Sequence, residues 1–420
     1  MDKQALQKWL REEAVKRGDE TVKWCSEMVK IPSEVPLSDT RDVCEYAKKI
    51  ITGFGGLEIS EHTQEEPVRN MVAVLKGNGK GKGKRLIFNG HLDTYPVGDR
   101  AAWDDDPFSG KIANGKIHGR GACDMKGGIA AAMMATKLLS EHLDMWSGEI
   151  VLALAGDEEN MGERGTKYLL DTVPAAVGDA MICPDVGVAN VLRFGQKGMY
   201  WISLEAVGKP GHGAHVHKGI NAIDRLVEGI TRINREVGGL PVNAPEMVTR
   251  AILDSAHVSE PLAGKGETEV LQKVTVNFGQ IGGGLTPNLI PAGAWAKADI
   301  RIPVGVTLDQ VIAKVKEIVD SIEGLSYTAM RAYAPNYSDP NHEIFGVLKK
   351  VVADVMQTEV VNTMRVGASD ARLYRLVKQV PSVNCGLTPY GLGGPNEYTD
   401  IKEMVDLSVI HALAALEYLQ

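Results

Sequence analysis

The sequence lacks closely spaced cysteine pairs, long apolar runs and an excess of basic residues. No CxxC pair occurs, which argues against a disulfide framework and a thiolate zinc site; the five cysteines are Cys25, Cys44, Cys123, Cys183 and Cys385. No apolar stretch is long enough to cross a bilayer, and the charged N-terminal segment does not resemble a signal peptide. We therefore expect a cytoplasmic protein with reduced thiols that does not bind membranes.

The charge balance and the size narrow the class of protein further. Acidic residues outnumber basic ones by 54 to 46, for a formal net charge of -8, so nucleic acid is not an expected partner. Apolar residues make up 44% and charged residues 24%, which is typical of folded globular proteins. A chain of 420 residues exceeds one ordinary hydrophobic core, and we expect two domains.

Short apolar stretches alternate with helical patterns in the first 197 residues. Continuous apolar strands of this kind predict a parallel sheet covered by helices on both faces; they lie at 71–75, 86–88, 149–155 and 180–183. The first fifty residues predict two helices separated by IPSEVPLSD. The glycine and lysine segment at 77–85 lacks the order of a phosphate-binding loop, so we interpret it as a hairpin turn.

The pattern changes near residue 198. Alternating strands and two helical stretches, 222–237 and 308–322, predict an antiparallel sheet covered by two helices. Helix and strand alternation then returns, and the C-terminal helical pattern at 401–419 is expected to pack on the sheet. We predict an α/β fold: a mostly parallel sheet flanked by helices, formed by residues 1–197 and 329–420, with an inserted smaller α+β lid or dimerisation domain at 198–328.

Residues that could bind a metal follow the predicted parallel strands. Ligands gather where such strands end, because the loops there surround a crevice. These loops carry acidic residues and one histidine, namely His91 with Asp93, Glu158 with Glu159, Asp185, and Asp124 in a glycine-rich loop. This mixture of nitrogen and oxygen donors suits zinc, manganese or cobalt.

The spacing within these clusters suggests different tasks for neighbouring residues. Residues two apart on an extended segment point the same way, so Asp93 could accept the second imidazole proton of His91 and fix its tautomer. The adjacent Glu158 and Glu159 point to different sides, so that one can bind metal while the other moves protons. The run from Asp104 to Asp106 is interpreted as a solvated turn.

The ordered motifs along the chain resemble the M20 metallopeptidase family, which includes acetylornithine deacetylase, succinyl-diaminopimelate desuccinylase, aminoacylase and carboxypeptidase G. The resemblance runs almost end to end. Its motifs are GHLDTYPVGD, WDDDPF, GRGACDMKGG, AGDEENMG, CPD, GKPGH, GINAI, GGLTPNLIPAGAWAKADIR, GASDAR and PNEY.

The resemblance implies a role for each candidate residue. His91 and Asp185 would hold one metal, while Asp124 would bridge to a second one bound by Glu159. Asp93 would support His91, and Glu158 would be the general base. In the inserted domain, His212 would stabilise an oxyanion, and Asn288 and Arg301 would bind polar groups of a substrate, often a carboxylate. His215 and His217 lie in the same loop and could take the place of His212.

One position departs from the family pattern. The last histidine ligand is expected a few residues before NEY, where this chain has Gly393. We therefore expect one tightly bound divalent ion per subunit. The resemblance implies hydrolysis of an amide bond in a small N-acyl amino acid or dipeptide. Two alternatives remain: hydrolytic deamination of an aminoaromatic acid, as in a nitroanthranilate aminohydrolase, and a non-catalytic member that keeps the fold. The resemblance also implies a homodimer and a small-molecule substrate bearing a carboxylate.

Overall fold

The computed structural model describes residues 2–79 and 83–419, and these divide into two compact units. The first unit contains the chain up to Phe194, Ser338–Thr363 and the chain from Ser369 onward. The second unit contains Gly195–Tyr337 and Met364–Ala368. The boundaries predicted from the sequence lie after residues 197 and 328.

A nine-stranded sheet runs through the part of the first unit that the structure describes. Its order is β1-β2-β6-β3-β7-β17-β8-β15, with β16 pairing β8. The central strands β6, β3, β7 and β17 are parallel, and antiparallel strands flank them. The bounds are β1 Leu57–His62, β2 Asn70–Asn78, β3 Arg85–His91, β6 Ser147–Ala155, β7 Ala180–Cys183, β8 Val191–Gln196, β15 Asn336–Tyr337, β16 Val361–Arg365 and β17 Ser382–Asn384.

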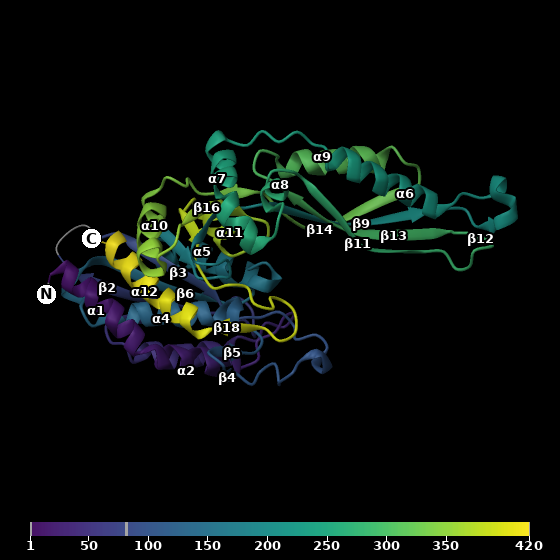
Figure 1. The fold of residues 1–420 in the computed structure, drawn as a ribbon. Helices are drawn as coiled ribbons and strands as arrows, with labels where there is room; N and C mark the ends of the chain where they lie inside the picture. The colour runs from purple at the N-terminus through teal and green to yellow at the C-terminus, as the bar shows by residue number, and fades with distance from the viewer. Residues whose placement is uncertain (1, 80–82, 420) are drawn as a thin grey trace. The chain divides into compact units, whose positions relative to one another are not determined.

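Helices cover both faces of this sheet. On one face α4 and the C-terminal α12 lie side by side (Figure 1), and α12 also contacts α1 and α10. The other face buries a core that joins the sheet to α5 and α11. The helices are α1 Lys3–Lys16, α2 Gly18–Val29, α3 Arg41–Thr52, α4 Gly127–Ser140, α5 Tyr168–Thr172, α10 Glu343–Met356, α11 Ala371–Leu373 and α12 Ile401–Tyr418.

The second unit is an antiparallel sheet in the order β11-β13-β9-β14 with helices packed on it. Its alternating strands bury every second side chain, as along β13, and the buried side chains pack with those of α6 and α9. The strands are β9 Gly198–Val207, β10 Gly211–His212, β11 Thr275–Gly283, β12 Leu289–Ile290, β13 Gly293–Ile302 and β14 Leu325–Tyr333; the helices are α6 Ala222–Arg232, α7 Glu246–Ala263, α8 Glu267–Leu271 and α9 Leu308–Asp320.

Two local predictions were wrong. The first predicted helix is two helices, α1 and α2, because the chain turns at Arg17; a Cβ at Gly18 would lie 3.0 Å from Val405 Cγ2, so glycine allows α12 to pack closely here. The segment at 77–85 does not join paired strands, since β6 lies between β2 and β3, although residues 80–82 of it lie outside the described residues. Two helices, α7 and α8, were not predicted from the sequence.

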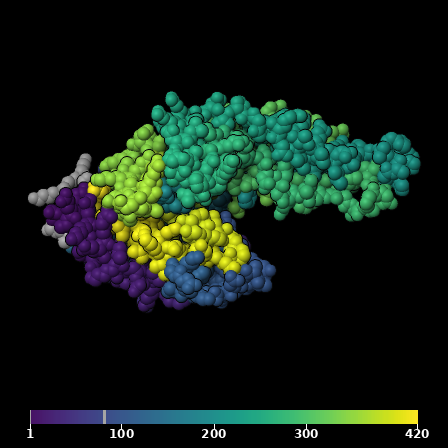
Figure 2. Space-filling view, viewed as in Figure 1, coloured from purple at the N-terminus to yellow at the C-terminus, as the bar shows by residue number. Residues whose placement is uncertain are grey.

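A small three-stranded sheet completes the first unit near the candidate site. It contains β4 Lys111–Ala113, β5 Lys116–His118 and β18 Tyr398–Asp400, with β5 in the middle. In the space-filling view the yellow C-terminal segment and the blue segment near residue 110 adjoin on the surface (Figure 2), in agreement with the antiparallel pairing of β18 with β5. The sheet thereby joins the segment before α12 to the chain that leads into the Asp124 loop.

Candidate metal centre

Three parallel strands end at the same edge of the large sheet. His91 is the last residue of β3, and it pairs with Ala155, the last residue of β6. The strand β7 lies on the other side of β3 in parallel register and ends at Cys183. The loops that follow these strands carry the predicted acidic residues, so the register brings the predicted strand-end residues to one edge.

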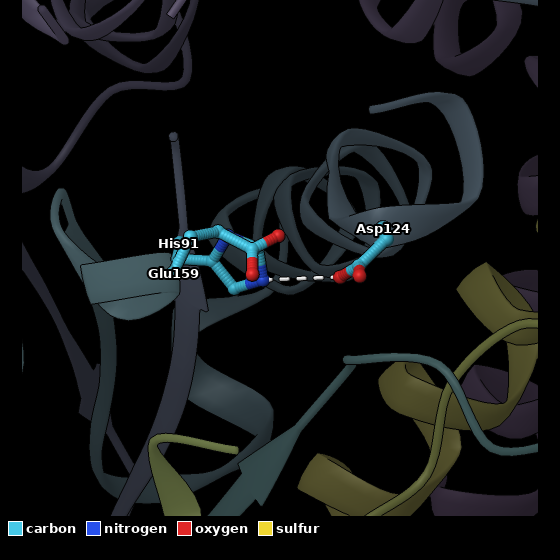
Figure 3. Close-up of side chains that lie close together, drawn as sticks. All are labelled: His91, Asp124 and Glu159. Carbon is cyan, nitrogen blue, oxygen red and sulfur yellow. Dashed lines mark hydrogen bonds and ion pairs between the residues drawn. The ribbon is translucent and has the colours of Figure 1, made fainter. Parts of the chain in front are cut away.

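His91, Asp124 and Glu159 form the group with the geometry of a metal site within the described ranges 2–79 and 83–419. Each offers a ligand atom, and these atoms all lie within 4.8 Å of one another. Figure 3 shows their side chains converging, with His91 Nε2 3.1 Å from Asp124 Oδ1. His91 is 2% exposed and Asp124 8%, so the group is shielded from bulk solvent.

Asp185, another predicted ligand, lies outside this group of three. It is 2% exposed and follows β7. Its negative charge nevertheless acts on the group. Burial and the charge of Asp185 raise the pKa of Asp124, whereas the hydrogen bond to His91 lowers it. Asp185 is therefore an electrostatic neighbour of the group in this structure.

Asp93 supports the site through its backbone and its carboxylate. Its main-chain oxygen lies 3.0 Å from His91 Nδ1, so this carbonyl orients the ring and leaves Nε2 facing Asp124. Its carboxylate, 3.7 Å from Nδ1, accepts hydrogen bonds from the backbone N–H groups of Glu158 and Glu159, both at 3.1 Å. Asp93 thus ties the two neighbouring strand-end loops together.

Burial raises the pKa of three acidic residues of the site, so they hold protons more tightly than they would in water. Burial, reinforced by the charges of Asp124 and Glu158, raises the pKa of Glu159 to about 11. Burial likewise raises the pKa values of Asp93 and Asp124 to about 6. A divalent cation would stabilise the ionised forms of these clustered, buried carboxyl groups.

The pKa of His91 is raised, whereas burial alone would lower the pKa of a histidine. Burial lowers the pKa of its imidazole, but the hydrogen bond to Asp124 and the charges of Asp124 and Glu158 outweigh it. The net effect raises the pKa well above 6.5. Asp124 therefore favours the protonated form of the His91 ring.

Arg372 is a site residue to which the sequence analysis gave no role. Its Nη1 lies 3.4 Å from Glu158 Oε1, and the guanidinium donates to the main-chain oxygens of Ser369 and Met161 at 2.8 and 2.7 Å. Arg372 is 2% exposed, so it holds a fixed position beside Glu158. Arg372 lies in the GASDAR motif, which was the available signal in the sequence. Its contact with Glu158, more than two hundred residues away, is visible only in the fold.

In the second unit, His212 and Asn288 lie together. β10 pairs with β12 so that His212 faces Leu289, and the Gly213 N–H donates to the Asn288 main-chain oxygen at 2.7 Å. His212 Nδ1 accepts a hydrogen bond from the Ala214 N–H at 3.1 Å. In a neutral ring the proton is then on Nε2, which can donate to an oxygen atom. His215 and His217 are exposed on the same loop, with ring contacts linking each to the next.

Arg301 lies at the opposite end of β13 from this pair. It faces Met199 at the start of β9, whereas Gly293, at the other end of β13, follows directly after β12. Eight steps along a strand span roughly 26 Å. The Arg301 guanidinium contacts Asp299 at 2.8 Å. Within one second unit, Arg301 therefore cannot meet the same small molecule as His212 and Asn288.

Gly393 occupies an exposed tight turn. Its φ is +69°, in the left-handed region that favours glycine, and Gly394 N–H donates to the Gly391 main-chain oxygen at 2.9 Å. A Cβ added at Gly393 would meet no atom within 4 Å. The run from Asp104 to Asp106 is likewise exposed, as predicted for a solvated turn.

The fold and this buried nitrogen and oxygen donor set define a metallohydrolase of the α/β class. The model of peptidase family M20/M25/M40 matches residues 87–417. The chain belongs to this family and is a metal-dependent hydrolase that acts on amide bonds. A divalent metal cofactor follows from that membership.

Curated relatives match over almost the whole chain. A succinyl-diaminopimelate desuccinylase of Rhodospirillum centenum is 26% identical over 397 residues, covering 92% of this chain and 94% of the relative. An uncharacterised metallohydrolase of Methanocaldococcus jannaschii is 24% identical over 421 residues, covering 93% and 98%. The family predicted from the motifs is therefore confirmed.

Solved structures share the fold. An M20 family metallo-carboxypeptidase of Sulfolobus solfataricus superposes with a TM-score of 0.80 at 20% identity, covering 95% of this chain and 99% of that one. Human carnosine dipeptidase 1 gives 0.73 at 19% identity, with 98% of both chains covered. The mostly parallel sheet flanked by helices is thus confirmed. In the described part of the chain, no helix has the length and apolar character needed to span a membrane.

Proposed function

We propose that this protein hydrolyses the amide bond of a small N-acyl amino acid or dipeptide at one tightly bound divalent ion. The observation that carries the proposal is the convergence of His91, Asp124 and Glu159 beside a further carboxylate, Glu158, which is held through its backbone by Asp93. A ligand set with an adjacent proton acceptor is what water-dependent hydrolysis requires.

The residues present fit a divalent cation. They supply one imidazole nitrogen and carboxylate oxygens, the donors that suit zinc, manganese or cobalt. Glu159 Oε1 is buried and has no hydrogen-bond partner among the described residues, as expected for an atom that binds a cation. When bound, such an ion polarises the scissile carbonyl and makes water nucleophilic near neutral pH. Asp185 is proposed to join the set, since it is buried and its charge acts on Asp124.

Glu158 is proposed as the general base. Asp93 fixes its backbone, and Arg372, anchored to two main-chain oxygens, lies beside its carboxylate. Glu158 would accept the proton of the attacking water and return it to the leaving amine. Arg372 would keep the carboxylate in one place during both transfers.

His212 is proposed as the donor to the oxyanion that forms on the substrate. The hydrogen bond from Ala214 leaves the proton of the neutral ring on Nε2, ready to be donated. Asn288 lies beside it and could bind the same group, while Arg301 could bind a substrate carboxylate. Because one second unit cannot place His212 and Arg301 on one small molecule, the three contacts require two copies of the chain. This supports the predicted homodimer.

A substrate panel tests the proposal. The metal-free protein would be reconstituted with zinc, manganese or cobalt and assayed for amine release from N-succinyl and N-acetyl amino acids and from dipeptides. The Glu158→Gln variant should lose about 10²–10⁴-fold in kcat because it cannot accept a proton. Glu163→Gln, which changes an exposed glutamate in the same loop, is the matched control and should remain active.

Several outcomes would contradict parts of the proposal. Ammonia release from an aminoaromatic acid, without amine release from acyl amino acids, would favour the deaminase alternative. Unchanged turnover in Glu158→Gln would remove the proposed base. Elemental analysis that finds two tightly bound ions per chain would contradict the single-ion prediction.

A further inference from the structure

A buried ion pair lies directly behind the Asp124 loop. Glu397 and Arg120 are 0% and 1% exposed, and Arg120 Nη1 lies 2.5 Å from Glu397 Oε2. The other carboxylate oxygen of Glu397 accepts hydrogen bonds from the backbone N–H groups of Cys123 and Asp124, at 3.0 and 3.2 Å. One carboxylate therefore contacts both the arginine and the backbone of a proposed metal ligand.

Arg120 joins this contact to two further segments. Its Nη2 donates to the main-chain oxygens of Pro96 and Gly394, at 3.2 and 3.0 Å. Pro96 belongs to the loop that follows His91 and contains Asp93, and Gly394 follows Gly393. The main-chain oxygen of Glu397 in turn accepts the Gly119 N–H at 2.9 Å. The pair thus connects the first ligand loop, the Asp124 loop and the C-terminal segment.

The backbone at Asp124 needs such support. Cys123 and Asp124 lie at the start of the segment Ala122–Lys126, where backbone N–H groups have no acceptor within the helix, and Asp124 and Met125 have non-helical φ/ψ of -118°/91° and -134°/28°. Glu397 supplies the acceptor instead. By accepting both N–H groups, it determines the direction in which the Asp124 carboxylate leaves the loop, toward His91 Nε2.

We propose that Glu397, paired with Arg120, is a positioning residue that sets the orientation of Asp124 as a metal ligand. The inference rests on the proposed function in taking Asp124 as a ligand. It gives the C-terminal segment a task at the site that does not depend on Gly393: the segment contributes a carboxylate that holds another ligand in place. Removing this support weakens metal binding and changes the coordination geometry.

The chemistry of the pair supports this assignment. A buried ion pair is costly to desolvate, and apolar residues of similar volume often serve folding equally well. A carboxylate can accept two N–H groups at one oxygen while its charge is balanced by Arg120 at the other, which an apolar residue cannot do. The arrangement holds the loop without adding net charge beside the acidic ligands.

Cobalt titration of the metal-free, full-length protein tests the proposal. The visible absorption of bound Co²⁺ reports coordination geometry, and competition with zinc gives the relative affinity. We expect Glu397→Gln and Glu397→Asp to bind metal about 10–100-fold more weakly and to change the Co²⁺ spectrum. Glu397→Asp keeps the charge opposite Arg120 but withdraws the acceptor from the two N–H groups, so it separates positioning from ion pairing. Arg120→Lys keeps a positive charge opposite Glu397 but cannot keep all the contacts to Pro96 and Gly394, so it should weaken metal binding less than Glu397→Gln does.

A matched control removes a different Arg–Glu pair from the same unit. Arg85 and Glu149 are paired at 2.5 Å where β3 and β6 begin, at the opposite end of these strands from His91. Glu149→Gln should reduce thermal stability but leave metal affinity and the Co²⁺ spectrum unchanged. Parent affinity and spectrum in Glu397→Asp would overturn the proposal. So would failure of both Glu397 variants to fold while Glu149→Gln folds, since the pair would then be structural.

The test also separates this inference from the proposed function. A parent protein that binds Co²⁺ but cleaves no acyl amino acid or dipeptide would remove the proposed substrate class and leave the role of Glu397 intact. Conversely, active protein whose metal affinity ignores Glu397→Asp would retain the proposed function and lose the positioning role.

Discussion

His411 gives this protein a measurable dependence of stability on pH that is independent of its active site. The residue lies in α12, is 0% exposed, and its Nε2 lies 3.1 Å from the main-chain oxygen of Cys385. Its ring contacts that of Phe88 in β3 at 5.1 Å. Burial lowers its pKa to about 4, although the hydrogen bond to Cys385 opposes the shift. In the folded protein the ring is neutral and donates its proton to the carbonyl.

The sign and size of the effect follow from that shift. A histidine whose pKa is depressed on folding binds protons more readily in the unfolded chain, so stability falls as pH drops from 6.5 toward 4. Taking 6.5 for the unfolded chain, His411 alone should reduce the free energy of unfolding by about 2 kcal/mol between pH 7 and pH 5 and by about 3 kcal/mol at pH 4.

Replacing His411 with Gln isolates this contribution. The glutamine amide can donate to Cys385 but does not titrate, so His411→Gln should lose less stability on acidification than the parent by the amounts above. Urea unfolding of both metal-free proteins at pH 7, 6 and 5, followed by tryptophan fluorescence, measures the difference. Shared contributions from the acidic groups cancel in the comparison. Parallel pH dependences for the two proteins would refute the reasoning, whatever their absolute stabilities.

Three further predictions concern the site. Gly393→His should allow a second ion to bind, at a cost of about 1 kcal/mol for the left-handed backbone; unchanged metal stoichiometry would contradict the register assumed for this segment. Asp93→Ala removes the acceptor for two backbone N–H groups, so kcat should fall about 10–100-fold in steady-state assays with folding intact. Burial and Glu158 raise the pKa of Asp370 from 3.8 to about 7, so the fold loses stability as the pH rises from 3.8 to about 7. Asp370→Asn should therefore raise Tm at pH 8 relative to the parent and have a smaller effect at pH 5.

Many residues of the candidate site could be predicted because they lie at the ends of parallel strands, and strand ends can be recognised from neighbouring residues alone. Apolar runs that bury both faces predict parallel strands, and the residues directly after them, such as His91 and Glu159, must then lie at one edge of the sheet. Asp124 could be named because a glycine-rich loop and a following helix surround it. The same local signals missed α7, and they suggested a hairpin where β6 separates β2 from β3.

Sequence by itself determined most of the elements, the strand ends and the chemical types of the ligands, because these depend on patterns within a few neighbouring residues. Tertiary structure alone decided which of those residues meet: that Glu159 rather than Asp185 completes the closest group with His91, and that the Asp93 carboxylate holds the loop of Glu158. It also decided that Glu397 supports Asp124 from 273 residues away. Such contacts join segments far apart in the chain, and their geometry arises only when the whole core packs.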